Sequence, residues 1–368
     1  MDLIKKLFLI ILGAMSLLAC SSPSSEDSPS SSNSDDFDRE ALLINLADNI
    51  IIPAYEDLNI KLKALKLAKD DFISQPDNTN LVALRASWLG AYRTWQFAEM
   101  FNIGKAEEIL FAFQMNIYPV SITDVEANVF SGTYDLSHTN NNDAVGFPAV
   151  DYMLFGIAND DVEILNKYAD VKYLNYLSDL INQMQSLTET VLNDWKTSYR
   201  DTFVSQKTNT VTSTLNKFVN DYIFYYEKGL RANKFGIPAG VFSSTPLPDK
   251  VEGLYSKNIS KELALDALLA VQNTFNGKYY GSDRSGESFK SYLGYLKRND
   301  LATAVNSRFD AARQKIQVLD MNFNSQINTD NTKMTEAFDA LQLIVVSLKV
   351  DMLQAFNISV DYVDADGD

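Results

Sequence analysis

Apolar residues recur every three or four positions through most of the chain after Asp36, and this periodicity limits the fold more than any other feature. Such spacing gives each helix one apolar stripe and leaves its opposite face polar. The 368 residues contain only nine prolines and fifteen glycines to interrupt the pattern. We therefore predict an all-α protein whose helices bury their apolar stripes against one another.

The pattern predicts long helices separated by turns that contain Gly, Pro or several polar residues. The clearest interruptions are the Asn-rich residues 131–142 and the Gly/Pro-rich residues 236–248. The expected helices cover residues 38–73 with a kink at Pro53, 81–101 with a cap at Thr79, 107–129, 148–155, 171–195, 202–233, 260–276, 289–297, 301–327 and 332–356.

The length of the chain suits one large or two ordinary domains. The break at 236–248 favours two packed helical bundles. A faint echo between residues 91–95 (AYRTW) and 221–225 (DYIFY) leaves internal duplication open beside two unrelated bundles. We predict an N-terminal bundle over residues 37–200 and a C-terminal bundle over residues 201–368.

The first twenty residues have the features of a lipoprotein export signal. Two lysines precede an apolar run, residues 7–18, that is too short to cross a bilayer, and Ala19 stands directly before Cys20. We expect a signal peptide over residues 1–19 and lipid on Cys20. The lipid would anchor the protein to the outer membrane of a cell envelope, facing the periplasm or the outside. The alternative is a transmembrane anchor with an incidental cysteine.

Residues 20–36 are almost all Ser, Pro, Asn, Asp and Glu, and are predicted to form a disordered tether because they have nothing apolar to bury. Cys20 is the single cysteine of the chain. An intramolecular disulfide is therefore excluded, and stability must come from packing. A cysteine zinc site and a thiol nucleophile are excluded as well, since the one thiol is expected to carry lipid.

The charge balance limits the partners. The chain has 32 Lys and Arg against 48 Asp and Glu, which gives a formal net charge of -16. Phosphate recognition needs clustered cations, so nucleic acid and anionic lipid surfaces are excluded. An acidic surface suits solubility, or the attraction of cations.

Residues 146–156, GFPAVDYMLFG, resemble the Gly-x-His-x-x-Glu signature of the imelysin family. The resemblance extends over most of the mature chain. It implies a helical cell-envelope protein in a family that also includes relatives of the periplasmic component of ferrous-iron uptake systems, and that is also classed with metallopeptidases. The blocks that are similar to family blocks, in the same order, are 88–104, 113–124, 236–240, 250–256 and the closing 366–368.

The chain departs from this signature where a metal would bind. Gly146 matches, but Pro148 stands in place of the histidine and Asp151 in place of the glutamate. Residues three apart share a helix face, so His and Glu there could hold a metal jointly. Pro148 has no lone pair to offer and suits the first turn of a helix. The one histidine of the chain, His138, lies in a polar loop and is expected to be solvated.

Asp151, Glu99 and Glu252 are the predicted ligand-binding residues. A carboxylate on an apolar helix face must be hydrogen-bonded, paired with a cation, bound to a metal or protonated. If the three converge between the two bundles, they would form a pocket for iron, another hard cation or a small ligand. The alternative is that these acids cap helix ends or pair with Arg93 and Lys250.

The resemblance and the residues together predict a binding or accessory lipoprotein in iron acquisition. One alternative is a metallopeptidase of the imelysin type, which we do not expect to be active because carboxylates alone would have to supply the polarised water. The other alternative is a surface binder of glycan or peptide. Serine-nucleophile and phosphate-loop motifs are absent from the sequence.

Overall fold

The computed structural model describes residues 35–362, and every regular element in that range is helical. The single strand-like contact there is an isolated bridge between Lys278 and Ser285. The predicted all-α class is thus confirmed. The predicted signal peptide, Cys20, the predicted tether before residue 35 and the closing residues 366–368 lie outside the described residues. Among the helices described, none has the length and hydropathy to cross a bilayer.

The first part of the chain forms long helices joined by short ones. Its elements are α2 (Arg39–Ile44), η1 (Asn45–Ile51), α3 (Ile52–Ser74), α4 (Asn78–Ala98), α5 (Lys105–Glu108), α6 (Phe111–Met115), α7 (Ile122–Ser131), η2 (Thr139–Asn141), α8 (Gly146–Asp151), η3 (Tyr152–Gly156), α9 (Asp161–Lys167), α10 (Val171–Asp194), η4 (Trp195–Tyr199) and α11 (Arg200–Ser205).

The second part of the chain also consists of long helices joined by short ones. Its elements are α12 (Thr214–Phe224), η5 (Tyr225–Gly236), η6 (Pro248–Lys250), α13 (Ser260–Phe275), α14 (Phe289–Tyr295), α15 (Asn299–Gln317), α16 (Phe323–Val345), η7 (Val346–Met352) and α17 (Leu353–Phe356). The η elements of the chain are π-helical, except η2 and η6, which are 3-10 helices.

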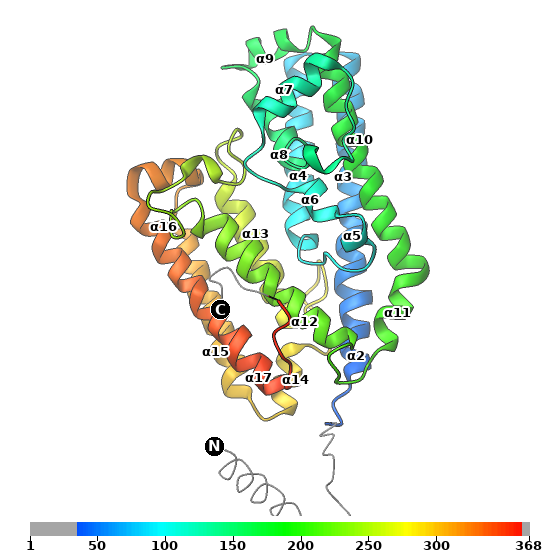
Figure 1. The fold of residues 1–368 in the computed structure, drawn as a ribbon, viewed down its shortest axis with the longest axis vertical. Helices are drawn as coiled ribbons and strands as arrows, with labels where there is room; N and C mark the ends of the chain where they lie inside the picture. The colour runs from blue at the N-terminus through cyan, green and yellow to red at the C-terminus, as the bar shows by residue number, and fades with distance from the viewer. Residues whose placement is uncertain (1–34, 363–368) are drawn as a thin grey trace, which may run out of the picture. The chain divides into compact units, whose positions relative to one another are not determined.

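Two groups of long helices make up the part of the chain after Asp36. Helices α3, α4 and α10 pack together on one side of Figure 1, and α15, α16 and η5 pack together on the other. Helix α13 packs against both α4 and α15 and so joins the groups. Within the described part of the chain, residues 37–362 belong to one compact unit. The boundary at 200/201 and the duplication stay predictions.

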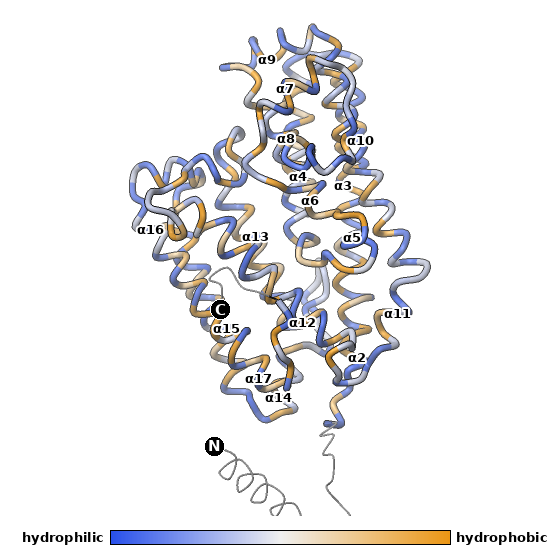
Figure 2. Tube along the Cα trace, viewed as in Figure 1, coloured by the Kyte–Doolittle hydropathy of each residue, from blue (hydrophilic) through white to orange (hydrophobic). Residues whose placement is uncertain are grey.

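The helices alternate apolar and polar residues along their length, as Figure 2 shows. Within α4, Leu81, Leu84, Trp88 and Tyr92 are all buried, as the spacing of three or four residues predicts. The N-cap of this helix is Asp77, whose carboxylate accepts the Asn80 N–H at 2.9 Å. The predicted cap at Thr79 is therefore wrong by two residues, because Asp is a strong cap in its own right.

Three predicted long helices are interrupted in the structure. Residues 107–129 break where Leu110 has a φ of 55° and where Pro119 offers no N–H donor, so α7 starts afresh behind its Ser121 cap. Residues 202–233 break before Ser213, which caps α12. Residues 301–327 break before Asn322, which caps α16. In each case the apolar spacing continues across the break, but a polar side chain accepts backbone N–H groups there and starts a new helix.

Pro53 stands in the first turn of α3, directly after the π-helical stretch η1. A proline is tolerated there because the first turn of a helix does not need its N–H. The helical run predicted over 38–73 is thus present as α2, η1 and α3 in succession.

Helix α8 is held against α4 by aromatic packing. The rings of Phe147 and Tyr92 stack with centroids 4.5 Å apart and planes 1° apart. The indole N–H of Trp88 donates to the Phe147 carbonyl at 3.3 Å. Phe147 is fully buried, which contributes roughly 2–3 kcal/mol of transfer free energy. This packing places the signature segment beside the polar residues of α4.

Candidate functional site

Glu99 and Glu252 meet in the interior although 152 residues separate them in the chain. The amide nitrogen of Asn116 donates to Glu99 Oε1 at 2.8 Å and to Glu252 Oε1 at 2.9 Å, so one nitrogen bridges the two carboxylates. The hydroxyl of Tyr225 donates to Glu99 Oε2 at 2.9 Å. Both acids are therefore held in fixed orientations.

A lysine neutralises this pair. The Lys234 ammonium lies 2.6 Å from Glu252 Oε2 and 3.8 Å from Glu99 Oε2. It also donates to Gln96 Oε1 at 2.8 Å, and the amide of Gln96 in turn donates to Glu252 Oε1 at 3.1 Å. The side chains of Lys234 and Glu252 are each 2% exposed, and that of Glu99 is 13% exposed. An ammonium among three side-chain oxygens occupies the position that a small cation would take. We call Glu99, Glu252, Lys234, Gln96 and Asn116 the polar cluster.

Four separate segments supply the polar cluster. Helix α4 carries Gln96, and Glu99 follows at its C-terminus. Asn116 is the C-cap residue of α6, and its amide oxygen accepts the Tyr92 hydroxyl at 2.7 Å. Lys234 lies in η5, near the Gly/Pro-rich break, and Glu252 lies in the loop between η6 and α13. Gln96 and Lys234 are 138 residues apart, so only the packed chain assembles the cluster.

Asp151 lies outside the polar cluster and holds the loop that carries Glu252. Its two carboxylate oxygens accept the backbone N–H groups of Tyr255 and Ser256, both at 2.9 Å. That loop turns at Gly253, whose φ is 71°, directly after Glu252. Asp151 is thus a positioning residue: it fixes the loop that carries Glu252.

Burial dominates the electrostatics of the site. It raises the pKa of Asp151 to about 7, against the opposing effect of the hydrogen bonds from Tyr255 and Ser256. Burial also raises the pKa of Glu99, and the nearby Lys234 charge counteracts the rise. The pKa of Tyr118 is raised well above its usual value by burial and by the charges of Glu252 and Glu99. One ammonium thus serves both glutamates.

Two of the three predicted ligand-binding residues come together. Glu99 and Glu252 share the Asn116 amide, whereas Asp151 reaches Glu252 only through space and through the loop that it holds. Arg93, the cation suggested as a partner in the alternative interpretation, pairs with Asp266 at 2.7 Å instead. The ligand-binding role of the three acids stays a prediction.

The sequence interpretation missed Lys234, Gln96 and Asn116. A signal for Lys234 was available, because it lies one helical turn after the apolar Leu230. The side chains of Leu230 and Lys234 are both buried, and a buried lysine must have an anionic partner. The sequence alone does not predict which acid is that partner.

The signature segment does not fit a metal held jointly by imidazole and carboxylate. Pro148 is buried in the first turn of α8 and has no donor atom. Asp151 already uses both oxygens, and Glu252 is occupied by Lys234. His138 is exposed in its loop, where its Nδ1 accepts the Asn140 N–H at 3.2 Å. Within residues 35–362, no group of three or more His, Cys, Asp or Glu side chains is arranged to hold a metal ion.

The fold and the site define an all-α protein with a buried carboxylate pair at the junction of its helices, neutralised by its own lysine. The imelysin family model matches residues 51–349, and the chain belongs to this family. Its signature is altered at positions 148 and 151.

Known proteins are similar over most of the chain. Iron-regulated protein A of Synechococcus elongatus is 23% identical over 293 residues, which cover 75% of this chain and 76% of the relative. The crystal structure of an imelysin-like protein from Psychrobacter arcticum superposes with a TM-score of 0.71 at 16% identity, covering 88% of this chain and 97% of the other.

A second crystal structure, of a putative iron-regulated protein A precursor from Parabacteroides distasonis, also superposes with a TM-score of 0.71. It is 19% identical and covers 86% of this chain and 95% of the other. Both structural likenesses concern the fold.

Proposed function

We propose that this protein is a binding or accessory lipoprotein of the cell envelope that serves iron acquisition and does not hydrolyse peptides. The observation that carries the proposal is the convergence of oxygens from Glu99, Glu252 and Gln96 on one point, beside a signature segment without imidazole. The iron context is supported by the names of a relative and of a structural neighbour, both called iron-regulated protein A.

The proposed ligand is iron or another hard cation, taken as cargo by Glu99 and Glu252 with Asp151 behind them. Hard cations prefer oxygen donors, and carboxylate and amide oxygens converge here. In the structure, the Lys234 ammonium is already bound to these oxygens. A cation would therefore enter only when the ammonium withdraws, so Lys234 competes with the cargo.

Metal titration of lipid-free protein, with Cys20 replaced by serine, tests this competition. Lys234→Met removes the competing charge and should bind iron at least about tenfold more tightly than the unchanged protein. Adding Glu99→Gln to Lys234→Met should abolish the gain. Elemental analysis of each purified protein would show whether metal is retained.

Lys69→Met is the matched control. Lys69 is also a buried lysine paired with a carboxylate, Asp70, at 2.7 Å, but it lies outside the polar cluster. Its removal should leave iron affinity unchanged. Equal iron affinity in the unchanged protein, the Lys234→Met variant and the double variant with Glu99→Gln would mean that the polar cluster is not the cation site.

The peptidase alternative can be tested separately. Hydrolysis needs a polarised water, and the signature segment supplies neither imidazole nor an unoccupied glutamate for it. Incubation with an unfolded polypeptide should give no cleavage that a chelator suppresses. Chelator-sensitive cleavage that Glu99→Gln abolishes would establish the peptidase instead.

We propose that Cys20 carries the lipid that anchors the protein to the outer membrane. Cys20→Ser should move the protein from the membrane fraction to the soluble fraction of the cell envelope. Protease treatment of intact cells would distinguish a periplasmic from a surface-facing orientation. Retention of Cys20→Ser in the membrane fraction would contradict the lipid anchor.

A further inference from the structure

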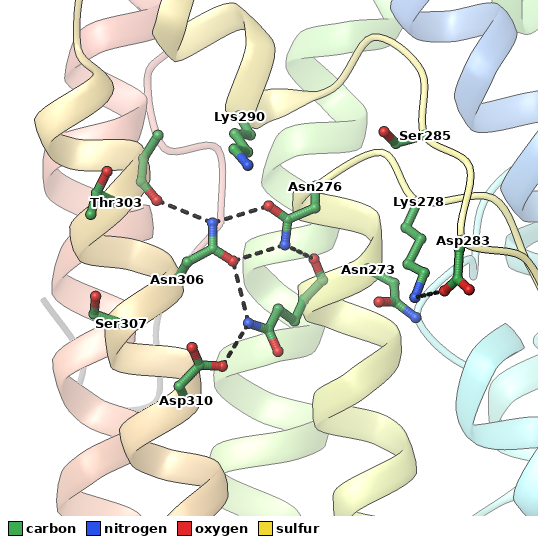
Figure 3. A pocket seen from close by; sticks show the side chains of 12 residues that line it. Asn273, Asn276, Lys278, Asp283, Ser285, Lys290, Thr303, Asn306, Ser307 and Asp310 are labelled. Atoms are coloured by element: carbon green, nitrogen blue, oxygen red, sulfur yellow. Dashed lines mark hydrogen bonds and ion pairs between the residues drawn. The ribbon is translucent and has the colours of Figure 1, made fainter.

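A surface groove of about 650 Å³ lies between α13 and α15, and it shares no residue with the polar cluster (Figure 3). Of its twelve lining residues only Ala302 is apolar. Pockets for drug-like or lipid ligands are lined mainly by apolar and aromatic side chains. This groove therefore suits a ligand whose own surface consists of hydrogen-bonding groups.

The floor of the groove is a ladder of side chains between the two helices. Asn276 and Asn306 donate to each other, at 2.8 and 3.0 Å. Gln272 donates to Asp310 Oδ1 at 3.1 Å, and its own amide oxygen accepts from Arg313. Because these groups are already fixed, a ligand would not have to order them, which lowers the entropic cost of binding.

Several groups of the wall remain available to a ligand. Within residues 35–362, the side chains of Lys290, Asn273 and Ser307 have no hydrogen-bond or ion-pair partner. Figure 3 shows the Lys290 ammonium directed toward the ladder from above, and Asn273 and Ser307 on opposite sides of it. The wall thus offers an ammonium, an amide and a hydroxyl around one space.

The charges of the groove leave Lys290 as its anion-binding group. The other lysine, Lys278, pairs with Asp283 at 3.0 Å on the rim. Asp310 offers an acceptor oxygen at the floor, since only its Oδ1 takes the Gln272 amide. A ligand that fits should therefore present hydroxyls toward Asp310 and an anionic group toward Lys290.

We propose that this groove binds a saccharide that carries a carboxylate, such as a hexuronate unit of an acidic glycan. A sugar hydroxyl both donates and accepts, which matches a wall that mixes amides, hydroxyls and a carboxylate. The sugar carboxylate would pair with Lys290 in a charge-assisted hydrogen bond. A peptide fits less well, because its side chains would find no apolar subsite.

Calorimetric titration of the lipid-free protein with trigalacturonate tests the proposal, with neutral maltotriose as the comparison. Trigalacturonate should bind saturably and at least about tenfold more tightly than maltotriose at physiological ionic strength. Lys290→Met and Asp310→Asn should each weaken trigalacturonate binding by about tenfold. Asp310→Asn keeps an oxygen that can accept from Gln272.

Lys315→Met is the matched control. Lys315 belongs to the same helix, α15, but lies outside the groove and pairs with Glu336 at 2.9 Å. Its loss should leave trigalacturonate affinity unchanged. The absence of saturable binding, equal affinity for the two saccharides, or unchanged binding by a folded Lys290→Met protein would each overturn the proposal. Iron titration reports on different residues, so the two proposals can fail independently.

Discussion

Charge compensation governs the residues of the polar cluster. Two carboxylates and one ammonium lie in the interior, and amide groups satisfy most of the remaining oxygens. Removing one member of such a group is more damaging than its net contribution suggests, because the partners stay buried and unpaired. Lys234 is therefore both the cation of the cluster and the residue on which its order depends.

The pH dependence of stability should reveal Asp151. Its folded-state pKa is about 7, above the ordinary 3.8, so the folded protein holds a proton that the unfolded chain releases. The contribution of Asp151 to the free energy of unfolding should thus be fully present below about pH 4 and be lost as pH rises from 4 through 7, by roughly 4 kcal/mol. Glu99, whose pKa is also raised, adds to the fall. Urea denaturation from pH 4.5 to 8 would measure it.

Asp151→Asn should flatten this pH profile, because the variant has no proton to lose at that position. The exposed Asp339→Asn on α16 serves as the control and should follow the unchanged protein. A profile for Asp151→Asn that runs parallel to the unchanged protein would show that Asp151 titrates at its ordinary pKa.

At the scale of elements, the close approach of the Gly146 and Met115 backbones decides where α8, the helix of the signature segment, begins. Gly146 starts α8 with a φ of 73°, and a Cβ on it would lie 2.2 Å from the Met115 carbonyl oxygen. Only glycine fits such a conformation at such a distance. Phe147 then stacks on Tyr92 of α4. This helix is placed by contacts with α4 and α6 rather than by its own six residues.

Two Gly→Ala substitutions should have opposite effects on stability. Gly146→Ala should destabilise the protein by about 2 kcal/mol or more, since it combines a steric clash with an unfavourable φ. Gly90→Ala, inside α4 with nothing within 4 Å of the added Cβ, should stabilise it by roughly 0.5–1 kcal/mol. Thermal and urea unfolding would measure both. Equal effects of the two changes would contradict the close approach at Gly146.

At the scale of the whole molecule, the polar cluster and α13 tie the two groups of helices together. Glu99 and Gln96 come from the first part of the chain, whereas Lys234 and Glu252 come from the second. Arg93 of α4 and Asp266 of α13 add an ion pair across the same junction. We expect the described residues to unfold as one cooperative unit.

The three tryptophans make that expectation measurable. Trp88, Trp95 and Trp195 all precede residue 201, so their fluorescence reports on the first part of the chain alone. Far-UV circular dichroism reports on helices throughout. Urea transitions followed by the two signals should coincide. Separate midpoints would show that the two groups of helices unfold independently.

The sequence by itself determined the helical class, because apolar periodicity is a local property and each helix carries its own pattern. It also showed that residue 148 has no imidazole, since the identity of a side chain does not depend on the fold. The ends of several helices were harder to predict, because caps such as Asp77 and Ser121 compete with a periodicity that continues past them.

Only the tertiary structure decided which cation serves the buried acids. The sequence indicated that Glu99 and Glu252 need compensation, but Arg93 and Lys250 were as reasonable as Lys234 before the chain was packed. The choice depends on distances between separate segments, of which Glu99 and Lys234 are more than a hundred residues apart in the chain. Burial makes the Lys234–Glu252 contact at 2.6 Å decisive where an exposed one would count for little.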